Sequence, residues 1–293
     1  SRRAGSERHA TGDLALNVEY NMRVDEHQNL PDVNRLSVLA ASILLVYALT
    51  PFLQIPETSL SIQLPGFFFQ LPLTVYTLVS VLVAVLAAAG TSWLLNDHPR
   101  LGDQRTYQHW LLPALTAWAI GVPLQTLEVG LQWWAVFAFG GVLLVLVFVA
   151  EYIVVDIGDE RQAPASVGLI AVSFALYLTL AIALRASGVR LYLLLPALVP
   201  AVALVVARSL YLRLGGRWCW YWAAGIALAV GQVALGLHYW PVQPLSYGLA
   251  VTGPAYALTS LASAIEEERA RNTLWIEPVV WLALCWGLAA IIG

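Results

Sequence analysis

The stretch LQWWAVFAFGGVLLVLVFVAEYIVV, residues 131–155, decides the fold class of this chain. Glu151 is its only charged residue, and the rest is apolar except for Gln132. A helix needs about 20 consecutive apolar residues to cross a hydrocarbon layer of about 30 Å. The stretch therefore predicts a membrane-spanning α-helix.

Eight further apolar stretches surround this one and are joined by short polar loops. Hydrophobic residues make up 59% of the chain and charged residues only 11%, whereas soluble domains carry roughly 25% charged residues. We therefore predict an all-α fold, a polytopic transmembrane helical bundle of about nine spans. The spans are Leu36–Leu53, Phe68–Leu95, Trp110–Leu127, Leu131–Val155, Ser166–Leu184, Leu191–Leu212, Trp218–Leu237, Leu245–Ile265 and Leu274–Ile292. The third and fourth could instead form a broken or re-entrant pair, because Gly121 and Pro123 interrupt the third.

The arginines predict the orientation of these spans. All 15 basic residues are arginine, and all except Arg185 and Arg190 fall on the side that holds the N-terminal segment. Cytoplasmic loops carry the excess of positive charge in membrane proteins. We expect a multi-pass protein of the inner (cytoplasmic) membrane, with its N-terminus in the cytoplasm and its C-terminus outside.

Two regions are predicted along the chain. Residues 1–35 form a polar, cytoplasmic N-terminal segment, and residues 36–293 form the transmembrane helical domain. Met22 is the only methionine, so translation could begin there and residues 1–21 could be an extension that is not native. The net charge of −3 includes no basic patch for nucleic acid. Cys219 and Cys285 lack metal-binding spacing, and we expect no metal and no cofactor.

A short internal similarity predicts a duplication. Residues 130–136 read GLQWWAV, and residues 236–242 read GLHYWPV. The segments 68–184 and 191–292 would then be two four-helix repeats that follow one first span, a 1+4+4 scheme. Because an even number of spans separates the two repeats, they would share one orientation, as parallel repeats of transporters do.

Three residues are candidate ligand-binding residues because polar groups within spans are costly and often functional. Glu151 lies in the fourth span, Gln232 near the middle of the seventh and Trp118 within the third. The structural alternatives are a Glu151 carboxylate that reaches water or pairs with Arg161 or Arg105, and a Gln232 amide that joins helices.

The loop after the second span holds a cytoplasmic polar cluster, which could contact lipid phosphates. The alternative is a solvated loop whose charges pair with one another. The cluster consists of Asp97, His98, Arg100, Asp103 and Arg105.

Glu266, Glu267 and Arg271 match the EExxxR element and so resemble the CAAX-type intramembrane proteases over six residues. That family also needs downstream histidines to activate water, and no histidine follows His238. We therefore exclude this protease activity. The sequence also lacks the GxSxG and HExxH motifs of other hydrolases.

Three functions agree with these features. The first is a transporter-like or binding module for an apolar or lipid-like molecule, favoured by the repeat and by Pro196 and Pro200 within one span. The second is a structural or accessory subunit that binds a membrane protein partner or a second copy of itself. The third is an enzyme that acts on lipid head groups at the cytoplasmic face and uses Asp97, His98, Asp103 and Glu160. In each case the lipid bilayer is the expected surrounding.

Overall fold

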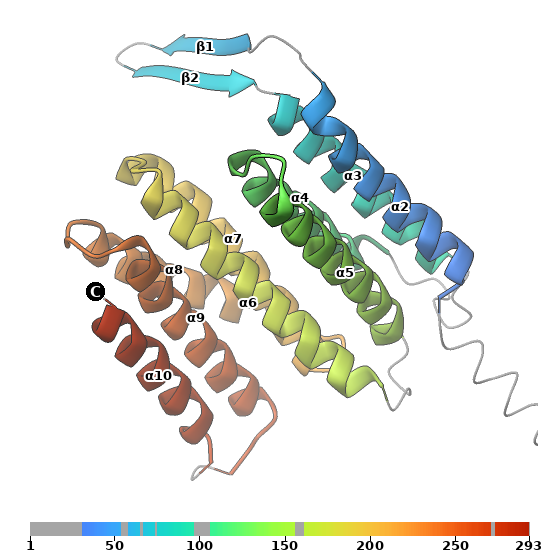
Figure 1. Cartoon of the computed structure of the whole chain (residues 1–293). Helices are drawn as coiled ribbons and strands as arrows, with labels where there is room; N and C mark the ends of the chain where they lie inside the picture. The colour runs from blue at the N-terminus through green and yellow to red at the C-terminus, as the bar shows by residue number, and fades with distance from the viewer. Residues whose placement is uncertain are drawn as a thin grey trace, which may run out of the picture. The chain divides into compact units, whose positions relative to one another are not determined.

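The computed structural model describes residues 31–53, 58–64, 67–73, 75–96, 106–155, 161–270 and 273–292. Helices account for nearly all regular structure in these ranges (Figure 1). Their order is α2 (Val33–Leu49), α3 (Val75–Leu95), α4 (Leu111–Thr126), α5 (Leu131–Val154), α6 (Gln162–Ala186), α7 (Leu191–Arg213), α8 (Trp220–His238), α9 (Pro244–Glu266) and α10 (Ile276–Ile292). Two short 3-10 helices, η1 (Thr50–Phe52) and η2 (Thr106–His109), precede the hairpin and α4.

Seven of these helices are long and apolar enough to cross a membrane. The other two, α4 and α10, are apolar but shorter. The 16 residues of α4 extend about 24 Å, which is less than a typical hydrocarbon layer. The helical class expected from the sequence is thus confirmed, and the apolar helices indicate a membrane-embedded protein. The full count of nine spans stays a prediction.

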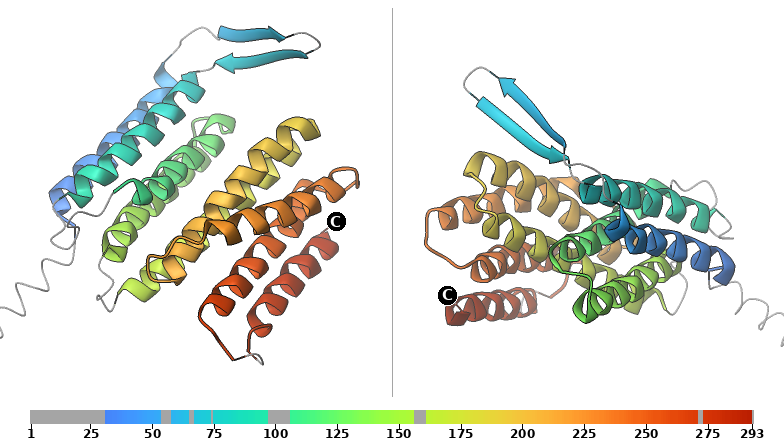
Figure 2. Two further views of the ribbon diagram at one scale, coloured as in Figure 1. Left: turned by 180° about the vertical axis from the view of Figure 1, so that it is seen from behind. Right: turned by 45° about the horizontal axis from the view of Figure 1, so that its top comes forward.

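A β-hairpin between α2 and α3 corrects the predicted second span. β1 (Thr58–Leu64) pairs antiparallel with β2 (Phe67–Leu73), in a register that places Ile62 opposite Phe69. Helix α3 therefore begins at Val75 rather than at Phe68. The hairpin projects beyond the ends of α2 and α3 (Figures 1 and 2). Ser59, Ser61 and Gln63 alternate with apolar residues in β1, a period that suits a strand and not a helix.

The chain divides into two compact units, Ser1–Gln162 and Ala163–Gly293. The first unit contains α2 to α5 and the hairpin, and the second is formed by α6 to α10. The predicted boundary between repeats, near residues 184–191, differs from this division, because α6 belongs to the second unit. The internal repeat therefore stays a prediction from the sequence.

The core of the first unit consists of apolar residues spaced one helical turn apart. Leu39, Ile43 and Tyr47 on α2 recur every four residues and pack with residues of α3, α4 and α5. The Tyr47 hydroxyl donates a 2.6 Å hydrogen bond to the Ala117 carbonyl of α4. A polar side chain within this apolar core is thereby satisfied.

In the second unit, α9 is the central helix. It packs against α7, α8 and α10, and two of its glycines permit close approach. A Cβ at Gly248 would lie 2.6 Å from Ile182 of α6, and one at Gly253 would lie 2.7 Å from the Cβ of Cys285 in α10. Small residues at such crossings allow helices to pack closely in a membrane. Ile182 of α6 and Cys285 of α10 thus pack directly against glycines of α9.

Candidate functional site

A pocket of about 810 Å³ lies between α6, α9 and α10 in the second unit. Its size falls within the range of roughly 300–1,000 Å³ that is typical of small-molecule sites. The residues that line it come mainly from those three helices. They are Ala163, Ser166, Val167, Ile170, Ala171, Phe174, Ala175, Leu178, Leu212, Arg213, Leu249, Thr252, Tyr256, Glu267, Arg269, Glu277, Trp281, Leu284 and Cys285.

Side chains of α6 form one wall of the pocket. Residues four apart lie on the same face of a helix, and Ala163, Val167, Ala171 and Ala175 form one such row. All four are exposed. Three of them are alanines, whose short side chains leave the space of the pocket open.

The opposite wall contains aromatic rings of α9 and α10. Tyr256 lies 5.0 Å from Trp281 of α10, between ring centroids. The same tyrosine contacts Phe174 of α6 edge to face, at 5.1 Å. Aromatic pairs in this arrangement add to the stabilisation from burial alone. Tyr256 therefore joins all three helices around the pocket.

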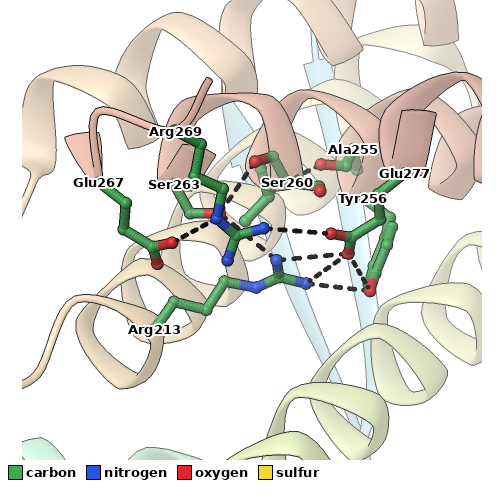
Figure 3. A network of polar contacts seen from close by, with 9 residues as sticks. Arg213, Ala255, Tyr256, Ser260, Ser263, Glu267, Arg269 and Glu277 are labelled. Atoms are coloured by element: carbon green, nitrogen blue, oxygen red, sulfur yellow. Dashed lines mark hydrogen bonds and ion pairs between the residues drawn. The ribbon is translucent and has the colours of Figure 1, made fainter. Parts of the chain in front are cut away.

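One end of the pocket is polar and is centred on Arg213 and Glu277 (Figure 3). The Arg213 guanidinium donates to Glu277 Oε1 through Nη1 at 3.4 Å and Nη2 at 3.3 Å. It also donates to the Tyr256 hydroxyl at 2.9 Å and to Ser263 Oγ at 3.4 Å. The Tyr256 hydroxyl donates in turn to Glu277 Oε1 at 3.1 Å. The planar guanidinium supplies several donors in fixed directions, which an ammonium group cannot do.

The charges of Arg213 and Glu277 lie at helix ends whose dipoles stabilise them. Arg213 is in the last turn of α7 and Glu277 is in the first turn of α10. A helix dipole favours cations at its C-terminus and anions at its N-terminus. The pairing of Arg213 with Glu277 thus stabilises both helix ends as well as the pocket.

Arg269 and Glu267 extend the network toward solvent (Figure 3). Arg269 donates through Nε to Glu267 Oε2 at 2.6 Å, and its Nη1 lies 4.0 Å from Glu277 Oε2. Its side chain is 47% exposed, whereas that of Arg213 is 15% exposed. The two arginines balance the two glutamates. The polar end therefore carries dense hydrogen-bonding capacity with no net charge.

The structure places the predicted ligand-binding residues outside this pocket. Glu151 is fully buried in α5, and Trp118, 48% exposed, is on α4, both in the first unit. Gln232 is on α8 of the second unit, and its side chain is exposed rather than directed into the helix bundle. The role of these three residues in binding stays a prediction.

Glu151 has a buried partner that the sequence alone did not indicate. Its Oε2 lies 2.7 Å from Nδ1 of His109, the last residue of η2. His109 is 2% exposed and Glu151 is 0% exposed. The predicted polar cluster of Asp97, His98, Arg100, Asp103 and Arg105 precedes this histidine and lies outside the described residues.

Sequence reasoning missed Arg213 and Glu277 as a pair. We expected Arg213 to contribute only to the charge asymmetry, and 64 residues separate it from Glu277. A usable signal existed in the predicted topology, which places the end of the sixth span and the start of the ninth on one side of the membrane. An arginine at one of these ends and a glutamate at the other are natural partners.

The apolar helices and the polar-ended pocket define a class, a membrane-embedded helical protein with an amphipathic pocket. A family model described as a protein of unknown function, DUF5656, matches residues 55–292. The chain belongs to this family, since the match covers most of its length and includes every pocket residue. No curated protein matches the chain, and no solved structure matches it.

Proposed function

We propose that this protein is a multi-pass membrane protein that binds a lipid-like molecule in the pocket between α6, α9 and α10. The observation that carries the proposal is the amphipathic pocket itself. Its length is lined by alanine, valine, leucine and aromatic side chains, and its polar end contains Arg213, Glu277 and Tyr256. An apolar tail fits the first part, and a polar head group fits the second.

The chemistry of the polar end favours a zwitterionic or uncharged head group. Because Arg213 and Arg269 are balanced by Glu267 and Glu277, the network offers no excess charge to a strongly anionic head. A head that carries both signs can interact with a guanidinium and with a carboxylate at once. A single-chain lipid with a phosphocholine head is therefore a suitable probe.

The proposal includes transport of the bound molecule. Pro196 and Pro200 lie inside α7, which continues through both residues. Each proline lacks the backbone N–H that would complete the helical hydrogen bond, so α7 is a place where the second unit can bend. Together with the predicted repeats, 68–184 and 191–292, this feature supports a transporter-like protein.

We further propose that the protein crosses the inner membrane with its N-terminus in the cytoplasm. In this orientation the polar end of the pocket faces the cytoplasm, because it lies at the α7 C-terminus and the α10 N-terminus. The lipid-like molecule would then enter from the membrane, and its head group would lie near the water of the cytoplasm.

Cysteine labelling is expected to confirm this orientation. The native cysteines, Cys219 and Cys285, are buried and free, so an introduced exposed cysteine dominates the reaction. A membrane-impermeant maleimide should label Ser187→Cys, between α6 and α7, in intact cells. It should label Arg217→Cys, between α7 and α8, only after permeabilisation. The reverse pattern would show the opposite orientation, and labelling of both in intact cells would contradict the predicted span between them.

Blocking the pocket is expected to abolish lipid binding. Ala171 lines the pocket from α6 and is exposed, so Ala171→Trp fills the space without disturbing a packed core. Native mass spectrometry of the purified full chain, titrated with palmitoyl lysophosphatidylcholine, should give one saturable adduct for the wild type. We expect at least a tenfold loss of affinity in the variant, equivalent to about 1.4 kcal/mol.

The matched control is Ala183→Trp on the same helix. Ala183 is also exposed, but it is not among the residues that line the pocket. The control variant should bind as the wild type does. Equal affinity of Ala171→Trp and the wild type, or no saturable adduct with any variant, would overturn the proposed function.

A further inference from the structure

Two buried hydroxyl groups line the pocket without a hydrogen-bond partner among the described residues. They belong to Ser166 of α6, 7% exposed, and Thr252 of α9, 8% exposed. Ser246 of α9 also lacks a partner, but it does not line the pocket. A buried polar group that forms no hydrogen bond is costly. These two hydroxyls therefore favour a ligand that can satisfy them.

Neighbouring hydroxyls on the same helices behave differently. Ser173 of α6 donates to the Leu169 carbonyl, and Thr259 of α9 donates to the Ala255 carbonyl, both at 2.7 Å. Serine and threonine within helices commonly make this bond to the carbonyl four residues earlier. Ser166 and Thr252 have no such bond among the contacts of the described residues. Their donors thus remain available at the pocket wall.

The ligand group that suits such a hydroxyl is a carbonyl oxygen. A carbonyl only accepts hydrogen bonds, so one bond from a hydroxyl satisfies the donor and the ligand oxygen together. If the ligand group were a hydroxyl, the protein and ligand hydroxyls would together carry two O–H donors. One of these donors would form the hydrogen bond between them, and the other would have no acceptor in the apolar wall. Plain hydrocarbon would satisfy neither Ser166 nor Thr252.

Thr252 is also at a suitable depth for the linkage of a lipid. It precedes Tyr256 by four residues, so it lies on the same face of α9, about 6 Å from Tyr256 along the helix axis. Tyr256 belongs to the polar network that would hold the head group. The part of a lipid that joins head to tail would then lie beside Thr252.

We propose that the ligand is an acyl lipid whose linkage carbonyl accepts a hydrogen bond from the Thr252 hydroxyl, with Ser166 donating to a second ligand oxygen. This inference rests on the proposed function, and it narrows the ligand class from any amphiphile to those with an ester or amide carbonyl beneath the head. It assigns Thr252 a specificity role that is separate from the charged residues.

The test compares two probes that differ only in that carbonyl. Palmitoyl lysophosphatidylcholine has an ester linkage, and its hexadecyl ether analogue has the same head and chain length without the carbonyl. In native mass spectrometry of the full chain, we expect the wild type to bind the ester about tenfold more tightly. Thr252→Val keeps the shape of the side chain and removes the hydroxyl, and it should reduce this preference to about twofold or less.

Matched hydroxyl variants distinguish this inference from a general loss of structure. Thr259→Val removes a buried hydroxyl from the same helix, outside the pocket, and should retain the full ester preference. Ser166→Ala and Ser173→Ala form a second matched pair on α6, of which only Ser166→Ala should weaken binding. Equal binding of ester and ether by the wild type would overturn the inference and leave the proposed function standing. An unchanged preference in Thr252→Val would overturn the role of Thr252, whereas the absence of any saturable adduct would overturn both proposals.

Discussion

Replacement of Glu151 with leucine is expected to lower the free energy of unfolding by about 2–3 kcal/mol. The Glu151 carboxylate is fully buried, and it lies 2.7 Å from the ring of His109, which is itself 2% exposed. Removal of the carboxylate takes away the 2.7 Å hydrogen bond between two buried polar side chains, and the loss of such a bond in an apolar surrounding is costly. Helix α5 would then be poorly joined to the segment that precedes α4.

The measurement is reversible SDS-induced unfolding of the purified protein in micelles, followed by circular dichroism. Glu151→Gln retains a hydrogen-bonding oxygen near His109, and it should cost only about 1 kcal/mol. The double variant His109→Leu, Glu151→Leu should lose less than the sum of the two single losses, because neither partner is left alone. Additive losses would show that the two residues do not stabilise one another.

The positions of the helices could be predicted from the sequence because apolar length alone determines a membrane-type helix. The predicted span Leu191–Leu212 and α7, Leu191–Arg213, differ by a single residue. The error at the second span arose from the same rule. Residues 67–73 are apolar except for Gln70, and a short apolar run does not distinguish a strand from a helix. Pro65-Gly66, a dipeptide typical of turns, was the signal for the hairpin.

The candidate pocket could not be predicted because the helices are apolar on every side. A helix with one apolar stripe reveals which face is buried, but a helix that is hydrophobic all round does not. Gln232 illustrates this limit. The sequence predicted its position near the middle of the span but not the direction of its side chain. The face of α6 that lines the pocket became known only through its contacts with α9, such as Phe174 with Tyr256.

Replacement of Arg213 with methionine is expected to destabilise the second unit by about 2 kcal/mol. The change removes the hydrogen bonds to Tyr256, Ser263 and Glu277, and it leaves the Glu277 carboxylate without its closest cation. The loss of one partner of a fully buried pair costs about 3–5 kcal/mol. We expect a smaller value here, since the Glu277 side chain is 36% exposed and water can reach part of the carboxylate.

Two further variants separate the role of the pair from the loss of a positive charge. Arg217→Met removes an exposed arginine from the loop that follows α7, and it should change stability by less than about 0.5 kcal/mol. The double variant Arg213→Met, Glu277→Gln removes the uncompensated charge, so it should be more stable than Arg213→Met alone under the same SDS titration. If Arg217→Met lowered the free energy of unfolding as much as Arg213→Met, the total positive charge would stabilise this end of the bundle, and the Arg213–Glu277 contact would not. Lipid binding by the double variant should be weaker than by the wild type, because the proposed head-group site loses both the guanidinium and the carboxylate.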